Sequence, residues 1–530
     1  KAHYANVLAL GFAALLTFAP VAQFALKHRD VFLNRTRLTN VFAGKTREQG
    51  WLAVRSNLQK HLLMFNYRGD PNGRHNLPGE PMLDSATSVF AVLGMGFALS
   101  RWRRPKESLP AYWLLIMLAG GVFSLDFEAP QAHRAIGVLP PALLMASMAL
   151  ERLGREVEWA WRRKGTLAYA VALAGLLAYV GYANYHTYFA RQTKDFASWN
   201  AYSTSETITA RLMASLGTSV DYEVSSLYQG HPVLRFLAPE VTQYRRLDTT
   251  DVLPIRRTLE RDLMIIMDPD QHSLFFQLKQ YYPSANCQEY HPPFEAPAVL
   301  YTCRLTPADV ASIQGLPAAY YAGTGWEGEP KAVQTDRQLR FDWPAGAPLP
   351  LPFSVEWRGV LSVAVYGEYT LRLAAPGAAE VYLDETLLLE SPETGGQVEA
   401  RAPLAKGNHA FRVRAVGAPG HFELLWQPPG QNLQTVPLSA LYGPPVTNNG
   451  LLGKYYPNGD WREPPAFAQI DPRIALYFHI IPLPRPYTVE WVGKVLAPVE
   501  GDYRFGLESI DESQVFIDGH LVAESPLPNK

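Results

Sequence analysis

Hydrophobic and polar residues are distributed in two different ways along this 530-residue chain. Residues 1–190 contain long uncharged apolar runs, whereas residues 191–530 alternate apolar and polar positions with many Pro and Gly. Apolar runs of about 20 residues are typical of helices that cross a membrane, and alternation with a period of two is typical of half-buried strands. The pattern predicts a multidomain protein with a polytopic α-helical membrane region followed by a folded region rich in β-structure.

Five apolar segments within residues 1–185 are predicted to cross the membrane. The first and the last have the length that a span needs, whereas the middle three are shorter and each is also compatible with a buried core helix. None of the five contains Asp, Glu, Lys or Arg, which argues against a transporter because such residues mark ion and substrate pathways. The segments are Tyr4–Leu26, Ser85–Ser100, Ser108–Leu125, Ala135–Leu150 and Gly165–Tyr185.

Lys and Arg in the short loops predict the orientation of these helices. Residues 101–110 and 151–165 are rich in both, whereas residues 124–134 contain only Arg134. Since basic short loops stay in the cytoplasm, residues 27–84, 124–134 and everything after about 186 are expected outside it. The basic character of 27–84 opposes this orientation, but long loops follow the charge rule poorly.

Residues 191–312 are predicted to form a small extracytoplasmic α/β domain. Ser203 and Glu206 have the spacing of a capping box ahead of a helix that ends at Gly217. Strands are expected at Ser219–Leu227 and Leu263–Met267, and a second helix is expected at Gln271–Tyr281.

Cys287 and Cys303 are the only cysteines of the chain. They lie in this domain on expected neighbouring strands, where an extracytoplasmic environment would allow a disulfide worth about 3 kcal/mol. A pair of buried thiols is the alternative.

The chain contains an internal duplication with an offset of 134–135 residues. Its matching blocks alternate apolar and polar residues, which predicts two antiparallel β-sandwiches at residues 315–443 and 450–530. The pairs are LPLPFSVEWRG (349–359) with LPRPYTVEWVG (483–493), GEYTLRL (367–373) with GDYRFGL (501–507), and AEVYLDETLLLE (379–390) with SQVFIDGHLVAE (513–524).

These blocks resemble the protective antigen domain of adhesins, toxins and carbohydrate-active proteins. The first copy has the closing elements GNHAFRV (407–413) and LLWQPPG (424–430). The second copy stops at Lys530, before the equivalent elements. We therefore expect the second sandwich to be truncated and the chain to be a piece of a longer protein. The resemblance implies glycan binding through calcium, the only cofactor expected. Asp511, Glu512 and Asp518 are the metal or glycan candidates of the second copy, with a solvated turn as the alternative; the first copy retains only Asp384.

Two outer segments are dense in polar groups, FNYRGDPNGRHNLPGEP (65–81) and APQAHRAIGVLPP (129–141). Together with VFLNRTRLTNVF (31–42), they resemble the C-terminal half of bacterial polytopic glycosyltransferases of the dolichyl-phosphate-mannose protein mannosyltransferase type (family 39, GT-C fold). The resemblance covers residues 1–185. It implies an integral protein of the bacterial plasma membrane that transfers a sugar from a polyprenyl-phosphate donor to a glycan or protein acceptor outside the cytoplasm.

In that family an acidic catalytic pair lies in the first outer loop, which is expected upstream of Lys1, so the catalytic residues are unknown here. Five basic residues remain as candidates for the donor phosphate. The alternative for the arginines is that they anchor helices or cap loops, and Asp70 is either a functional acid or part of a simple turn. The five candidates are Arg68, Arg74, His75, His133 and Arg134.

Glycosyl transfer, with the sandwiches holding glycan, is therefore the favoured function. A non-enzymatic, membrane-anchored carbohydrate-binding adhesin or sensor is the alternative, although a plain anchor needs one span and no polar outer loop. The net charge of −1 gives no indication of a nucleic-acid partner.

Overall fold

The computed structural model describes residues 2–247, 253–475, 481–509 and 511–526. Contacts divide the chain into two units. The first consists of residues 1–247, 261–275 and 286–304, and the second of residues 248–260, 276–285 and 305–530.

The first unit begins with a helical region. Helices are present at all five predicted positions. Among the described residues, two segments are both long and apolar enough to cross a membrane, Tyr4–Lys27 and Ile136–Lys194. The remaining crossings stay a prediction. The helices are α1 (Ala2–Lys27), α2 (Arg29–Thr39), α3 (Arg47–Leu63), α4 (Ser85–Ser100), α5 (Pro105–Val122) and α6 (Leu139–His186).

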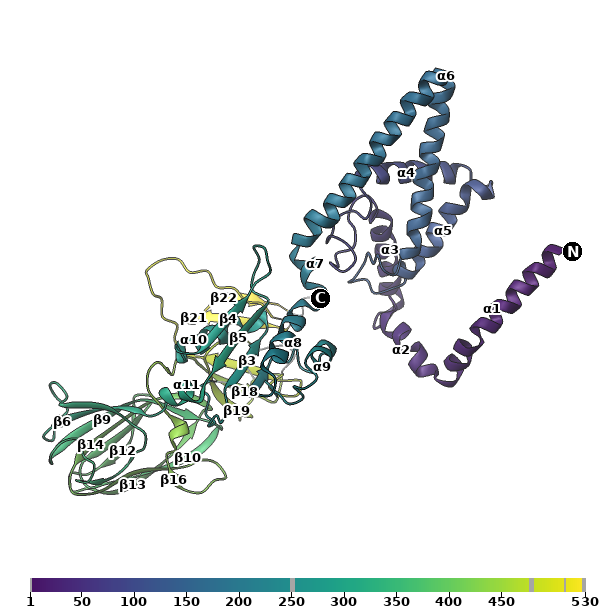
Figure 1. Cartoon of the computed structure of the whole chain (residues 1–530). Helices are drawn as coiled ribbons and strands as arrows, with labels where there is room; N and C mark the ends of the chain where they lie inside the picture. The colour runs from purple at the N-terminus through teal and green to yellow at the C-terminus, as the bar shows by residue number, and fades with distance from the viewer. Residues whose placement is uncertain (1, 248–252, 476–480, 510, 527–530) are drawn as a thin grey trace. The chain divides into compact units, whose positions relative to one another are not determined.

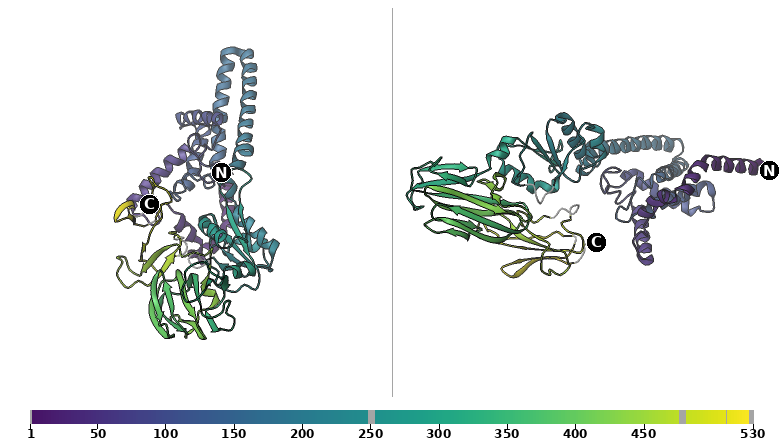
Figure 2. Two further views of the ribbon diagram at one scale, coloured as in Figure 1. Left: turned by 90° about the vertical axis from the view of Figure 1, so that its left-hand side faces the viewer. Right: turned by 90° about the horizontal axis from the view of Figure 1, so that it is seen from below.

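Helix α6 contains two of the predicted spans in one element. It turns sharply at Arg162, whose φ of 49° and ψ of −138° are not helical, and its two arms run side by side as a hairpin (Figure 1; Figure 2, left). The hydroxyl of Tyr169 donates to the carbonyl of Leu150 at 2.6 Å and ties the arms together. The basic stretch expected to be a loop between two spans is therefore mostly helical.

Small residues allow α4 and α6 to pack closely. A Cβ added at Gly94 would lie 1.8 Å from the carbonyl oxygen of Met145, so only glycine fits there. The contact belongs to a buried cluster that also includes residues of α3 and α5, and to which α4 and α6 contribute Ala98, Ala142 and Met145. This packing fixes the loops that join the helices.

The α/β domain contains a five-stranded sheet in the order β2-β1-β3-β5-β4. Strand β1 is parallel to β2 and β3, whereas β4 and β5 are antiparallel. The prediction for β3 is exact, and that for β1 is too long. The elements are α7 (Phe196–Asn200), α8 (Thr204–Leu216), β1 (Asp221–Val224), α9 (Pro232–Leu237), β2 (Arg245–Arg246), β3 (Leu263–Met267), α10 (His272–Tyr281), β4 (Asn286–Tyr290) and β5 (Leu300–Leu305).

The predicted capping box at Ser203 is wrong. Ser203 has a left-handed backbone (φ 56°) and its side chain makes no capping hydrogen bond, because this conformation turns the side chain away from the first turn of α8. Glu206 instead accepts a hydrogen bond from the hydroxyl of Ser205 at 3.1 Å. The predicted helix end at Gly217 is confirmed.

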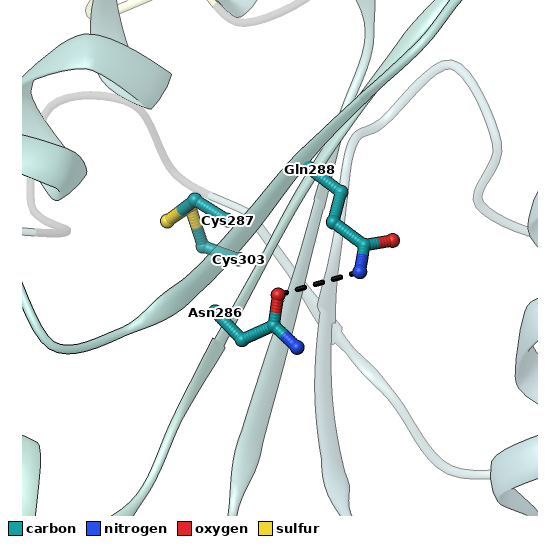
Figure 3. Close-up of a disulfide and its surroundings, with 4 residues drawn as sticks. All are labelled: Asn286, Cys287, Gln288 and Cys303. Carbon is teal, nitrogen blue, oxygen red and sulfur yellow. Dashed lines mark hydrogen bonds between the residues drawn. A yellow bond between two sulfur atoms is a disulfide. The ribbon is translucent and has the colours of Figure 1, made fainter.

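A disulfide joins Cys287 of β4 to Cys303 of β5 (Figure 3). The two residues are directly opposite each other in the antiparallel pair, with their Cα atoms 4.0 Å apart. The disulfide interpretation therefore holds over that of two buried thiols.

In the second unit, the first copy of the repeat is a sandwich of two sheets, whose layers are visible in Figure 2. One sheet has the order β13-β10-β15-β16 with β8 beside β15, and the other has the order β12-β11-β14-β9-β6-β7 with β17 beside β9. The strands are β6 (Leu316–Ala322), β7 (Ala332–Asp336), β8 (Arg340–Trp343), β9 (Phe353–Val363), β10 (Gly367–Ala375), β11 (Ala379–Leu383), β12 (Thr386–Ser391), β13 (Gly396–Leu404), β14 (Gly407–Gly417), β15 (Gly420–Gln427), β16 (Gln434–Thr435) and β17 (Leu441–Tyr442).

The second copy does not form the expected sandwich within the described residues. It contains a three-stranded sheet, β19-β18-β20, and a hairpin of β21 and β22, while residues 501–507 form no strand. Their counterpart in the first copy, β10, pairs with β13 and β15. The strands are β18 (Leu451–Tyr456), β19 (Phe467–Asp471), β20 (Thr488–Val492), β21 (Ser513–Ile517) and β22 (His520–Ser525).

Candidate functional site

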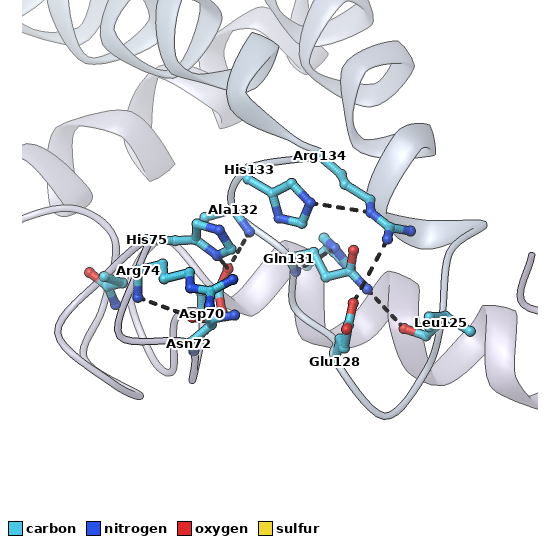
Figure 4. Close-up of polar contacts among 12 residues, drawn as sticks. Asp70, Asn72, Arg74, His75, Leu125, Glu128, Gln131, Ala132, His133 and Arg134 are labelled. Carbon is cyan, nitrogen blue, oxygen red and sulfur yellow. Dashed lines mark hydrogen bonds and ion pairs between the residues drawn. The ribbon is translucent and has the colours of Figure 1, made fainter. Parts of the chain in front are cut away.

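The two polar loops of the helical region meet around the buried side chain of Asp70 (Figure 4). One carboxylate oxygen accepts hydrogen bonds from the backbone N–H of Ala132 at 2.7 Å and from Nδ1 of His75 at 3.1 Å. The other accepts from the backbone N–H of Asn72 at 2.8 Å. Asp70 therefore joins the α3–α4 loop to the loop after α5, rather than only shaping a turn.

His61 of α3 binds the backbone of the loop after α5. Its Nδ1 donates to the carbonyl of Asn57 at 2.8 Å, and its Nε2 accepts from the backbone N–H of Gln131 at 3.0 Å. Because a backbone N–H can only donate, Nε2 carries no proton and the imidazole is neutral. Burial lowers the pKa of His61, in agreement with this state.

His133 and Arg134 lie at the rim of this junction. The ring of His133 stacks on that of His75, with centroids 4.5 Å apart and planes inclined by 25°. Nε of Arg134 lies 3.3 Å from Nε2 of His133, and its guanidinium lies 3.8 Å from the carboxylate of Glu128. Burial, followed by the electrostatic influence of His75 and Arg134, lowers the pKa of His133.

The remaining phosphate candidates make other contacts. Nε of Arg74 donates to the carbonyl of Ala201, and the hydroxyl of Tyr202 donates to the carbonyl of Arg74 at 2.8 Å. Arg68 is exposed and lies near Gly79 in the same loop. Direct contacts thus link His75, His133 and Arg134, whereas Arg74 contacts Ala201 and Tyr202.

Sequence reasoning named Asp70 only as a functional acid or a turn residue, and it missed His61. Asp70 stands in a Gly-Asp-Pro-Asn stretch that indicates a turn, and His61 is one histidine of a helix with no distinctive neighbours. The density of polar residues in 65–81 was the available signal, and it identified the loop but not the buried group.

The calcium candidates of the second copy are exposed. Asp511 lies 3.8 Å from the guanidinium of Arg485, and Asp518 occupies the β21–β22 turn with a φ of 49°. Among the residues that the structure describes, Asp511, Glu512 and Asp518 do not gather as one set of metal ligands. Calcium binding through them stays a prediction.

In the first copy, Asp384 has a structural partner. Its carboxylate lies 2.7 Å from Nδ1 of His409 and accepts from the backbone N–H of Ala410 at 2.9 Å. Nε2 of His409 lies 2.7 Å from the carbonyl oxygen of Ala405. Burial lowers the pKa of His409, but the hydrogen bonds to these acceptors outweigh it and raise the pKa overall.

Each copy contains a buried carboxylate at the end of its second strand. In the first, Asp336 accepts from the hydroxyl of Tyr320 at 2.6 Å, from Nε1 of Trp357 at 2.8 Å and from the amide of Gln334 at 2.6 Å. The equivalent group of the second copy has the same three kinds of donor. Asp471 accepts from Tyr455 at 2.8 Å, from Trp491 at 2.6 Å and from Gln469 at 2.5 Å.

The duplication corresponds to a known domain. Residues 312–439 and 447–526 match the family model of the PA14 domain. The C-terminal region consists of PA14 domains. The expected protective antigen type is therefore confirmed for both copies, and the helical region lies outside the matched residues.

Several proteins with related segments are named as anti-sigma factors or adhesins. Anti-sigma-I factor RsgI3 of Acetivibrio thermocellus is 24% identical over 151 residues, which span 26% of this chain and only 22% of that protein. A solved anti-sigma factor domain-containing protein from Clostridium clariflavum is 18% identical, with 40% of this chain and 80% of that one covered and a TM-score of 0.23. The PA14 sugar-binding domain from an RTX adhesin is 14% identical, with 25% and 99% covered and a TM-score of 0.22. The domain assignment rests on the family model.

Proposed function

We propose that this chain acts on carbohydrate at a membrane. In this proposal the PA14 domains bind glycan outside the cytoplasm, and the helical region transfers a sugar from a polyprenyl-phosphate donor to a nearby acceptor. The PA14 match and the sugar-binding name of the RTX adhesin domain support the first part. The two long apolar helices support a membrane location.

The proposal that the helical region transfers a sugar is supported by the loop junction at Asp70. It places His133 and Arg134 at an accessible rim, where a guanidinium suits a phosphate because it offers several donors in one plane. In this proposal Asp70 is a positioning residue, because its three hydrogen bonds already hold the two loops together. The general base is therefore a different carboxylate.

A transfer assay tests this role of Arg134. Membranes containing the complete gene product are supplied with a polyprenyl-phosphate-linked radioactive sugar, and incorporation into acceptor is followed. Arg134→Ala is expected to lose activity at least 10-fold, whereas Arg37→Ala, which removes an exposed arginine of α2, is expected to retain it. Equal turnover in the two variants would remove Arg134 from the site.

A membrane-anchored glycan sensor is the second candidate, favoured by the segment shared with anti-sigma factors. It predicts binding of polysaccharide without any transfer. Pull-down of the full chain on insoluble polysaccharides, combined with the transfer assay, separates the two functions. Calorimetry with Ca²⁺ on the same chain tests the metal prediction, and the absence of binding, or binding unaffected by Asp511→Ala, would end it.

A further inference from the structure

Three side chains of the loop junction have their ligand atoms close together. One oxygen of Asp70 and one nitrogen each of His75 and His133 all lie within 4.8 Å of one another. Asp70 and His75 come from the α3–α4 loop, and His133 comes from the loop after α5. Within the described residues, this is the one group of three His, Cys, Asp or Glu with such spacing.

Two imidazoles and a carboxylate match the ligand preference of zinc. A tetrahedral zinc ion with ligands at about 2.0–2.1 Å needs its ligand atoms roughly 3.3 Å apart. The distance between Asp70 and His75, 3.1 Å, already agrees with this spacing. His133 is exposed, so its ring can turn inward by the remaining 1–2 Å at little cost.

The surroundings of Asp70 resemble the outer shell of a metal site. The backbone N–H groups of Ala132 and Asn72 hold its two oxygens and would orient the carboxylate toward an ion. These donors come from both loops, so the carboxylate has its position before any ion arrives.

The positive guanidinium of Arg134 would repel a metal ion bound at this cluster. Its Nε lies 3.3 Å from Nε2 of His133, and Glu128 lies 3.8 Å from its guanidinium. A neutral imidazole has one free lone pair, so His133 can bind the ion only when Arg134 gives up its contact with Nε2 and stays paired with Glu128 alone. Glu128 offsets the positive charge next to the ion.

We propose that Asp70, His75 and His133 form a Zn²⁺ site that cross-links the two loops. The ion would replace the hydrogen bond between His75 and Asp70 and the stacking between the two rings with three coordinate bonds. This inference does not depend on glycosyl transfer, because it concerns only the ligands and the loops that they join.

The test measures zinc affinity of the full chain in detergent, purified without a polyhistidine tag. After chelator treatment, zinc is titrated in competition with a chromophoric chelator. The chain is expected to bind one ion tightly, and His133→Ala is expected to weaken that affinity at least 10-fold. His186→Ala is the matched control, because His186 is exposed at the end of α6 and outside the cluster.

Cobalt distinguishes this site from scattered surface histidines. Co²⁺ bound by these ligands is expected to show the strong visible absorption of a tetrahedral site, lost in His133→Ala and kept in His186→Ala. Asp70→Asn keeps the side-chain shape and is expected to weaken binding with an unchanged circular dichroism spectrum. Absence of tight zinc binding, or the same affinity and cobalt spectrum in His133→Ala, would overturn the proposal.

Discussion

The buried carboxylate of Asp336 is expected to stabilise the first PA14 domain through the donors that it satisfies. Tyr320 and Trp357 are fully buried, so Asp336→Ala would leave a hydroxyl and an indole N–H without acceptors. Each stranded donor costs about 1–3 kcal/mol. Gln334 is exposed and can turn to water, so its loss adds little.

Removal of a buried carboxylate also relieves its own desolvation, which offsets part of this cost. The net loss is therefore expected at about 2–4 kcal/mol. Tyr320→Phe removes one donor and leaves no partner stranded, so it should cost only about 1–2 kcal/mol. In the double variant, Asp336→Ala no longer leaves a tyrosine hydroxyl without an acceptor. The stability lost in the double variant should therefore be smaller than the sum of the losses in the two single variants.

Amide hydrogen exchange followed by mass spectrometry is the suitable assay. Peptides that cover β9 and β14 report the opening of this domain separately from the rest of the chain. A loss of 2–4 kcal/mol corresponds to exchange that is roughly 30- to 700-fold faster. A change of less than about threefold in Asp336→Ala, or full additivity in the double variant, would refute the account of stranded donors.

The raised pKa of His409 predicts that its stabilising contribution is complete below about pH 6.5 and is lost as the pH rises through the folded-state pKa. Asp384→Asn should remove this pH dependence. Hydrogen exchange measured across that pH range tests both statements. Replacing Cys303 by Ser should destabilise the α/β domain by about 3 kcal/mol and make its melting temperature insensitive to reductant. In the helical region, Gly121→Ala should cost about 1–3 kcal/mol, because the new Cβ would lie 2.2 Å from Nε2 of His61, and the melting temperature in detergent should fall.

Each of these expectations has a result that contradicts it. Parallel pH profiles for the wild type and the Asp384 variant would show that the buried histidine does not carry the effect. A melting temperature of the wild type that does not respond to reductant would show that the disulfide adds no stability. An unchanged melting temperature for the glycine variant would mean that the histidine ring can move aside.

Sequence periodicity alone predicted several elements accurately. Helix α4 and strand β3 begin and end at the predicted residues, because their signals lie within the segments themselves. The duplication was also visible, since matched blocks at one offset need no knowledge of contacts. Asp336 and Asp471 are also separated by the repeat offset, but neither lies in the matched blocks, and alternation gave no indication that either carboxylate is buried.

Tertiary structure alone decided how the loops and the second repeat are organised. Asp70 and Ala132 are 62 residues apart, and no local pattern indicates that they share a hydrogen bond. The sequence predicted a loop between two spans at residues 151–165, but not that this stretch stays helical on both sides of a single turn at Arg162. Residues 501–507 have the alternation of a strand and form none, because a strand also needs partners to accept its hydrogen bonds. Local sequence thus determined which segments can form a helix or a strand. Contacts between distant segments determined which of these segments form one in the folded protein, and where the site lies.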